Sequence, residues 1–316
     1  MSGRRVPLAG AGLVALAAGL WGTDALFRRG LALRLPAVEV VMWEHVILAA
    51  LTVPLVLRGA RRLQGLGARD WVALVVIGGG SSVAATVLFT EAFRHGDPNT
   101  PLLLQKLQPV FAAAAAWALL GERLRPRWFV YLGLALTGAV MISVRDPAAA
   151  DPADLLPAAL GAGAAALWAL GTVLGKHVSG KLDPLTITGL RFCLGLPVAA
   201  LLFLALEGEP AASVADLPAI VGLAFVPGLL ALVLYYRGLA GTTASAATLA
   251  ELAFPVSAVA VNAVAFGVTL SATQLTGAVL LAATITYLGL TDRSEPVALS
   301  VQPDRLDAAG ARRAPA

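Results

Sequence analysis

Charged side chains inside long apolar stretches are the residues of this sequence most suited to chemistry. Glu44, Lys106, Arg191 and Glu251 each lie well inside such a stretch. A charge at the centre of a bilayer costs about 2.5–3.5 kcal/mol on insertion scales, so it usually meets a partner or a cavity. Matching depths predict two acid–base pairs, Glu44 with Lys106 and Arg191 with Glu251. Such pairs act either as gates or as static partners that neutralise buried charge.

Aromatic, amide and proline residues complete the set of candidate cavity residues. Trp21 and Trp168 could stack on a planar or cationic ligand, or simply pack. Gln105 precedes one of the buried charges. Pro109 and Pro255 each remove one backbone hydrogen bond, which predicts kinks in the helices that carry them.

The other titratable residues in apolar stretches have simpler explanations. Asp24 precedes Arg28 by one helical turn, which favours a local ion pair. Glu91 and Arg237 lie near the ends of their stretches, where side chains reach the interface. His45 next to a carboxylate could relay protons, but a lone histidine is more often a packing residue.

The sequence contains no enzyme or metal signature. It has no HExxH motif, no phosphate-binding glycine loop and no nucleophile elbow, and its three histidines are scattered. Cys193 is the only cysteine, which excludes an internal disulfide. We therefore expect no enzyme, no cofactor and no metal, and no ATP-driven chemistry within this chain.

The composition indicates a membrane protein. Of the 316 residues, 58% are hydrophobic and 13% are charged, and the mean hydropathy is +0.81. A soluble domain carries roughly 25% charged residues. The net charge of +4 is a topology signal in such a chain, so we expect no nucleic-acid partner. Arginine-rich, alanine-rich usage hints at a GC-rich bacterial genome and hence a bacterial inner membrane.

About 20 apolar residues are needed to cross the hydrocarbon core. Ten stretches qualify as predicted spans: 7–27, 38–57, 71–93, 99–120, 127–144, 155–175, 184–206, 216–239, 243–267 and 272–290. They divide the chain into a first half (1–145), a linker (146–154), a second half (155–290) and a disordered tail (291–316). The first span also resembles a signal peptide, but its part in the repeat described below favours its retention.

The distribution of basic residues predicts the orientation. With the N-terminus inside, 16 of the 23 Lys and Arg residues lie on the inner side and 5 on the outer side, while Lys106 and Arg191 lie within spans. Inner loops of membrane proteins are enriched in positive charge. Both termini are therefore predicted to be cytoplasmic.

The two halves are internal repeats. Leu20-Trp21 matches Leu167-Trp168 at an offset of 147, and Gln108-Pro109-Val110 matches Phe254-Pro255-Val256 at an offset of 146. The same offsets relate Glu44 to Arg191 and Gln105 to Glu251. Because each half has an odd number of spans, the second half must enter the membrane from the opposite side, as in many secondary transporters.

Helix-breaking residues recur in both halves. Gly78-Gly79-Gly80-Ser81-Ser82 lies in the third span, and Pro227-Gly228 lies at the matching place in the eighth. Broken backbone at this depth is tolerated where it lines a cavity, so matching breaks point to the substrate path. Close helix packing by small residues is the alternative explanation.

The stretch Pro101 to Leu124, with Leu-Gln-Pro-Val-Phe followed by Leu-Leu-Gly-Glu-Arg-Leu, resembles the half-repeat of EamA-type transporters in the drug/metabolite transporter superfamily. Leu249 to Leu270 resembles the second copy. The resemblance implies ten helices, a cavity lined mainly by spans 1, 3, 4, 6, 8 and 9, and transport, preferably export, of a small metabolite. The family commonly has an arginine near the start of spans 2 and 7, whereas here the second span carries Glu44.

The sequence thus predicts an all-α membrane protein of two inverted five-helix repeats. We expect a secondary transporter that works by alternating access on a small-molecule substrate in a lipid bilayer, with a proton as the coupling ion to consider. The alternatives are an intramembrane enzyme that acts on lipid and a passive channel or scramblase.

Overall fold

A computed structural model describes residues 9–32, 34–92, 104–143, 155–267 and 271–291. These residues form helices joined by turns, with no strand among them. The predicted linker 146–154 and all but the first residue of the predicted tail 291–316 lie outside the described ranges. The predicted all-α fold class is confirmed.

The first half contains five helical segments in the described ranges, one for each predicted span. They are α1 (Ala9–Trp21) with α2 (Asp24–Ala32), α3 (Ala37–Arg58), α5 (Ala68–Val75) with η1 (Val76–Ala84) and α6 (Ala85–Ala92), α8 (Gln108–Leu120), and α9 (Pro126–Ser143). The short α4 (Ala60–Leu63) connects α3 to α5.

The second half repeats this order. Its segments are α10 (Leu155–Ser179), α11 (Pro184–Leu206), η3 (Val214–Asp216) with α12 (Leu217–Leu223), η4 (Ala224–Leu230) and α13 (Ala231–Ala240), α14 (Ala244–Glu251) with α15 (Ala253–Phe266), and α16 (Ala272–Thr291). By length and composition, seven stretches of the described residues can cross a membrane, and α8 and most of α16 are shorter apolar helices.

The interruptions of the helices fall at related places in the two halves. The segments η1 and η4 are π-helical, and η4 lies within the range obtained by adding 147 to the residue numbers of η1. π-Helical turns inside α-helices are frequent at functional sites. The glycine and proline clusters therefore interrupt spans 3 and 8 as predicted, by widening the helix.

The prolines of spans 4 and 9 lie just after the break in each helix. Turns occupy Lys106-Leu107 and Leu252, and Pro109 and Pro255 lie in the first turn of the helix that follows. A proline is tolerated in a first helical turn because its missing donor has no partner there. The break thus precedes each proline by two or three residues.

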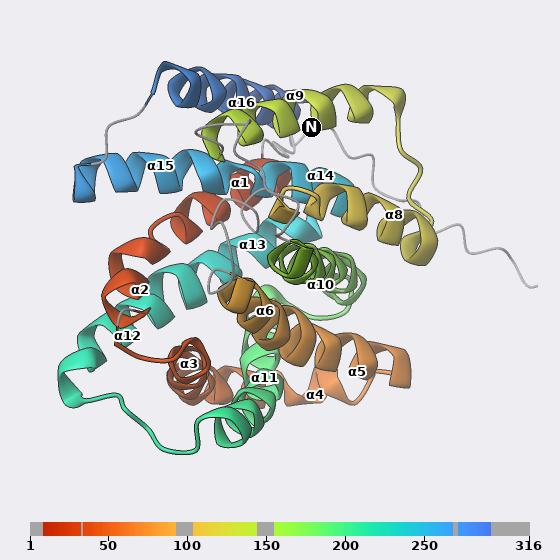
Figure 1. Ribbon diagram of the computed structural model, residues 1–316. Coiled ribbons are helices and arrows are strands. Elements are labelled where there is room, and N and C mark those ends of the chain that lie inside the picture. The colour runs from red at the N-terminus through yellow and green to blue at the C-terminus, as the bar shows by residue number, and fades with distance from the viewer. Residues whose placement is uncertain (1–8, 33, 93–103, 144–154, 268–270, 292–316) are drawn as a thin grey trace, which may run out of the picture.

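Each half accommodates the first helix of the other (Figure 1). Helix α1 packs on α13, α14 and α15, whereas α10 packs on η1, α6 and α8. Helices α3 and α11 contact each other, as do α9 and α16. Spans 2 and 7, and spans 5 and 10, thus meet as equivalent partners, as expected for two inverted repeats.

Small residues allow the closest of these contacts. A β-carbon at Gly138 of α9 would lie 2.9 Å from the carbonyl oxygen of Gly277 in α16. A β-carbon at Gly22, in the turn between α1 and α2, would overlap Oγ of Ser257. Helices in membranes associate through such close backbone approach, because lipid is as apolar as the side chains.

A capping aspartate begins α11. Asp183 accepts a hydrogen bond from the Thr186 amide at 3.0 Å and one from the Thr186 hydroxyl at 2.8 Å. Its carboxylate also pairs with Arg62 of the first half at 2.8 Å. Although partial burial opposes ionisation, the Thr186 hydrogen bonds and the Arg62 charge hold the pKa of Asp183 below its ordinary value.

Candidate functional site

A cavity of about 770 Å³ lies between the two halves. Its lining residues come from spans 1, 2, 3, 4, 6, 7, 8 and 9 within the described ranges, so spans 2 and 7 join the six expected from the family resemblance. All nine predicted residues line it: Trp21, Glu44, Gln105, Lys106, Pro109, Trp168, Arg191, Glu251 and Pro255. The volume lies within the usual range for small-molecule sites.

The partner of Glu44 is Arg28, and the predicted pairing with Lys106 was wrong. Arg28 Nη2 lies 3.3 Å from Glu44 Oε2, and Arg28 Nε lies 2.6 Å from Asp24 Oδ2. Asp24 and Arg28 are one turn apart on α2, so the predicted local pair is confirmed and reaches across to α3. One guanidinium therefore serves two carboxylates, which leaves this cluster with a formal charge of −1.

Lys106 is buried without an acidic partner among the described residues. Its side chain is 4% exposed, and its Nζ lies 5.7 Å from the centroid of the Phe254 ring. A cation over an aromatic face gains some electrostatic stabilisation. The neighbouring Gln105 has a buried Oε1 with no hydrogen-bond partner. Within the described ranges, this part of the cavity thus presents an ammonium group without an acidic partner and an amide oxygen without a hydrogen bond.

Arg191 is held by hydroxyl groups, so its predicted pairing with Glu251 was also wrong. Its Nε donates to Ser82 Oγ at 3.1 Å and its Nη1 donates to Tyr236 at 3.2 Å. Ser82 also lies 3.2 Å from Nε2 of His45, whose Nδ1 lies 2.8 Å from the Val41 carbonyl. Since that carbonyl can only accept, a neutral His45 accepts from Ser82 through Nε2.

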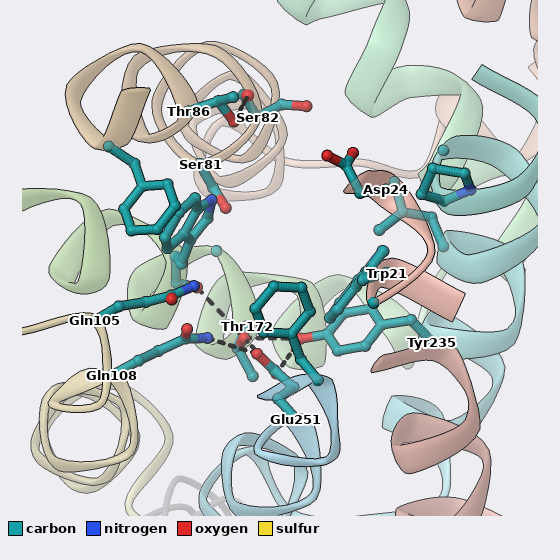
Figure 2. A pocket seen from close by; sticks show the side chains of 18 of the residues that line it. Trp21, Asp24, Ser81, Ser82, Thr86, Gln105, Gln108, Thr172, Tyr235 and Glu251 are labelled. Atoms are coloured by element: carbon teal, nitrogen blue, oxygen red, sulfur yellow. Dashed lines mark hydrogen bonds between the residues drawn. The ribbon is translucent and has the colours of Figure 1, made fainter. Parts of the chain in front are cut away.

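Glu251 is the acceptor at the centre of a second polar cluster (Figure 2). Its Oε1 accepts from Thr172 at 3.1 Å and from Tyr235 at 3.0 Å, and its Oε2 accepts from Gln108 at 2.5 Å. All three donors are uncharged, and among the described residues no cation lies within ion-pair distance of this carboxylate. Gln108 belongs to the first half, so the cluster joins the two repeats.

Two aromatic pairs occupy equivalent places in the cavity wall. Trp21 and Tyr235 form the first aromatic pair, with ring centroids 5.3 Å apart, and Trp168 and Phe89 form the second, at 5.1 Å. The repeat relates Trp21 to Trp168 and Phe89 to Tyr235. Each pair joins one tryptophan to an aromatic residue of the other half.

Sequence reasoning missed several residues of this cavity, although some were detectable. Phe89 and Tyr235 are 146 residues apart, which is the repeat offset. Gln108 and Thr172 have no signal of their own, because an isolated polar residue in a membrane helix equally often bonds its own backbone.

Two ion pairs outside the cavity join the halves at equivalent positions. Asp70 at the start of the third span binds Lys181 at 2.7 Å, and Asp216 at the start of the eighth binds Arg34 at 2.6 Å. Both aspartates are 2% exposed. They are 146 residues apart in sequence, and their basic partners are 147 apart.

The two interhalf pairs differ in one respect. Asp70 also lies 2.8 Å from Nε2 of His177, whereas Asp216 has no second basic partner among the described residues. Each carboxylate additionally caps its own helix, through the amides of Gly67 and Ser213 at 2.9 Å.

Two apolar five-span repeats around a cavity large enough for a small organic solute are the architecture of a membrane transporter of small solutes. The family model described as "EamA-like transporter family" matches residues 8–144 and 155–290. The chain therefore belongs to the EamA-like transporter family, and the predicted family and transporter class are confirmed.

Relatives and solved structures agree with this assignment. A "Riboflavin transporter ImpX" of Fusobacterium nucleatum subsp. nucleatum is 31% identical over 286 residues, which cover 86% of this chain and 94% of the relative. A solved crystal structure aligns with a TM-score of 0.72 at 22% identity over 89% of this chain and 96% of its own. At that identity the structural match supports the fold alone.

Proposed function

We propose that the chain is a secondary carrier that moves a planar organic solute by alternating access, with riboflavin as the first candidate. The observation that carries this proposal is the cavity between two repeats that each hold the first helix of the other. A symmetric pair of halves can exchange conformations, which exposes one site to either side in turn. The similarity to a riboflavin transporter supports the choice of solute.

The interhalf pairs support the mechanism. Under the predicted orientation, Asp70–Lys181 and Arg62–Asp183 lie on the cytoplasmic side and Arg34–Asp216 lies on the outer side. A rocking motion of the halves would separate the contacts of one side while it retains those of the other. Equivalent contacts on both sides are what such an exchange requires.

Counterflow in proteoliposomes tests the carrier mechanism. Vesicles loaded with unlabelled riboflavin are diluted into a trace of labelled riboflavin, and a carrier accumulates label transiently while an open pore does not. Equal label inside and outside at all times would instead favour the channel or scramblase alternative. An imposed pH gradient in the same vesicles tests proton coupling, and right-side-out against inside-out membrane vesicles test the export direction expected from the family.

Crosslinking tests alternating access directly. Cys193 is the only cysteine, so a Cys193→Ser background is free of thiols. In that background, the pairs Asp70→Cys with Lys181→Cys and Arg34→Cys with Asp216→Cys place one crosslink on each side. We expect a bifunctional thiol reagent with a disulfide in its spacer to bridge either pair and stop the transport that the untreated variant retains, and reduction of the spacer to restore that level. Full transport with a closed crosslink would contradict alternating access.

A further inference from the structure

The polar groups of the cavity are distributed unequally between its two equivalent walls. The repeat places Glu251 beside the first aromatic pair and Gln105 at the matching position beside the second. In Figure 2 the Gln105 and Glu251 side chains extend into the same cavity from different elements. One wall thus carries a carboxylate where the other carries a neutral amide.

The two aromatic pairs also differ in their polar groups. The first pair contains Tyr235, whose hydroxyl donates to Glu251, whereas the second contains Phe89, which has no hydroxyl. Flat aromatic faces on both walls favour a flat ring as ligand, because offset stacking and edge contacts both stabilise it. The hydrogen-bonding groups then decide which edge of that ring meets which wall.

Glu251 retains capacity to accept one more hydrogen bond. A carboxylate has about four acceptor positions. Gln108 fills one of them, and Thr172 and Tyr235, whose hydroxyls also bond each other at 2.7 Å, fill at most two more. Its charge has no cation within ion-pair distance in the described part of the chain. In a low-dielectric site, a hydrogen bond from a solute N–H to this carboxylate is stronger than one between neutral groups.

Another group in the cavity, Lys106, offers the complementary chemistry. Lys106 is a buried ammonium group whose described contact is the Phe254 ring, and an ammonium group can only donate. It therefore requires oxygen acceptors, which hydroxyl, carbonyl or acidic groups of a solute supply. Glu251 and Lys106 together favour a solute that carries an N–H donor on one part and oxygen acceptors on another.

We infer that the cavity binds a flat heteroaromatic solute in one orientation, with a ring N–H donated to Glu251 and an oxygen-bearing chain near Lys106. Glu251 is then the residue that selects solutes by their N–H edge. The inference rests on the proposed function, because it names the solute class of the same cavity.

Matched ligand pairs that differ by a single methyl group test this selection. Riboflavin has an imide N–H that 3-methylriboflavin lacks, and theophylline has a ring N–H that caffeine lacks. Binding to the full-length purified chain is followed by quenching of tryptophan fluorescence. Hydrogen bonds to charged groups predict that the N–H member of a pair binds roughly tenfold or more tightly.

Substitutions then test whether Glu251 is the residue that selects N–H ligands. We expect Glu251→Met to reduce the affinity ratio within a pair to about one, and Glu251→Gln to leave an intermediate ratio because its carbonyl still accepts. Asp183→Asn is the matched control, since it neutralises a carboxylate that does not line the cavity and should keep the ratio. Thermal unfolding of each variant confirms that it is folded.

The outcomes separate this inference from the proposed function. A wild-type chain that binds both members of each pair equally, or binds neither pair, overturns the inference, even where Glu251→Met does not fold. A ratio that survives Glu251→Met in the folded protein also overturns it. Counterflow of riboflavin decides the proposed function separately, whatever the preference for N–H ligands.

Discussion

Asp70 and Asp216 occupy the same position in the two repeats, and each binds a basic residue that belongs to the other repeat. Their partners, Lys181 and Arg34, are themselves equivalent. A duplicated contact of this kind arises naturally when each half contributes one carboxylate and one base to an interface with twofold symmetry.

Charge reversal tests whether Arg34 and Asp216, the pair predicted on the outer side, act together. We expect Asp216→Arg and Arg34→Asp each to lower transport and the melting temperature by roughly a few degrees, because each places like charges together. The double exchange should recover most of both losses, as measured by proteoliposome uptake and thermal unfolding. Additive losses in the double variant would mean that the two residues do not act as a pair.

Neutralisation of Asp70 should affect transport more than the fold of its own helix. Asp70→Asn keeps an oxygen for the Gly67 amide but removes the charge that binds Lys181 and His177. We expect reduced counterflow with near-normal helix content by circular dichroism. Lys181→Met should have a smaller effect, since His177 remains. Equal transport by the wild type, Asp70→Asn and Lys181→Met would show that the contact of Asp70 with Lys181 and His177 is dispensable.

The contact between α9 and α16 depends on the absence of a side chain at Gly138. Gly138→Val should destabilise the protein, because its β-carbon would approach the Gly277 carbonyl closely and the Leu281 side chain to within 3.0 Å. Overpacking of this kind costs typically about 1–3 kcal/mol. Gly133→Ala on the same helix is the control, since a β-carbon there meets nothing within 4 Å. Thermal unfolding in detergent measures both, and equal losses would contradict the packing.

Asp183 should contribute stability that depends on pH. Asp183→Ala removes a helix cap and should cost about 1 kcal/mol, whereas Asp183→Asn keeps the cap and loses the charge. Because the folded-state pKa of Asp183 lies below its ordinary value, its charge stabilises the fold fully above about pH 4. That advantage over Asp183→Asn should disappear as the pH falls through the folded pKa. Unfolding curves at pH 7 and near pH 3 check this, and a constant difference would argue against it.

The cavity charges predict which basic residue matters for the carboxylates of Asp24 in span 1 and Glu44 in span 2. Arg28→Gln should impair folding or transport, because it leaves Asp24 and Glu44 together without a counter-ion. The exchange Glu44→Lys with Lys106→Glu should not restore activity, since those two residues are not partners. Rescue by that exchange in an uptake assay would contradict the contacts described above.

Much of the fold could be predicted from the sequence, because hydrophobic length and repetition are strong signals in membrane proteins. The ten spans, the inverted repeat and the interruptions near Gly78 and Pro227 each follow from such signals. All nine candidate residues line the cavity, since burial of a charge in an apolar helix already implies a cavity or a partner.

The partners of those charges could not be predicted in the same way. Depth along a helix says how far a residue lies from the interface, but it does not say which direction the side chain faces. Arg28 reaches Glu44 because α2 begins anew after the turn at Gly22-Thr23. That turn changes the helix direction, and no regular periodicity anticipates it. The uncharged donors around Glu251 could not be predicted for the same reason, because the directions of their side chains were unknown.

The exchange of first helices between the halves has a consequence for biosynthesis. Helix α1 leaves the ribosome before α13, α14 and α15, the helices on which it packs. Until then, the chain must hold α1 in the bilayer with its protein-facing side covered by lipid or by an insertion factor. Final packing of α1 is therefore delayed until α13, α14 and α15 have been synthesised.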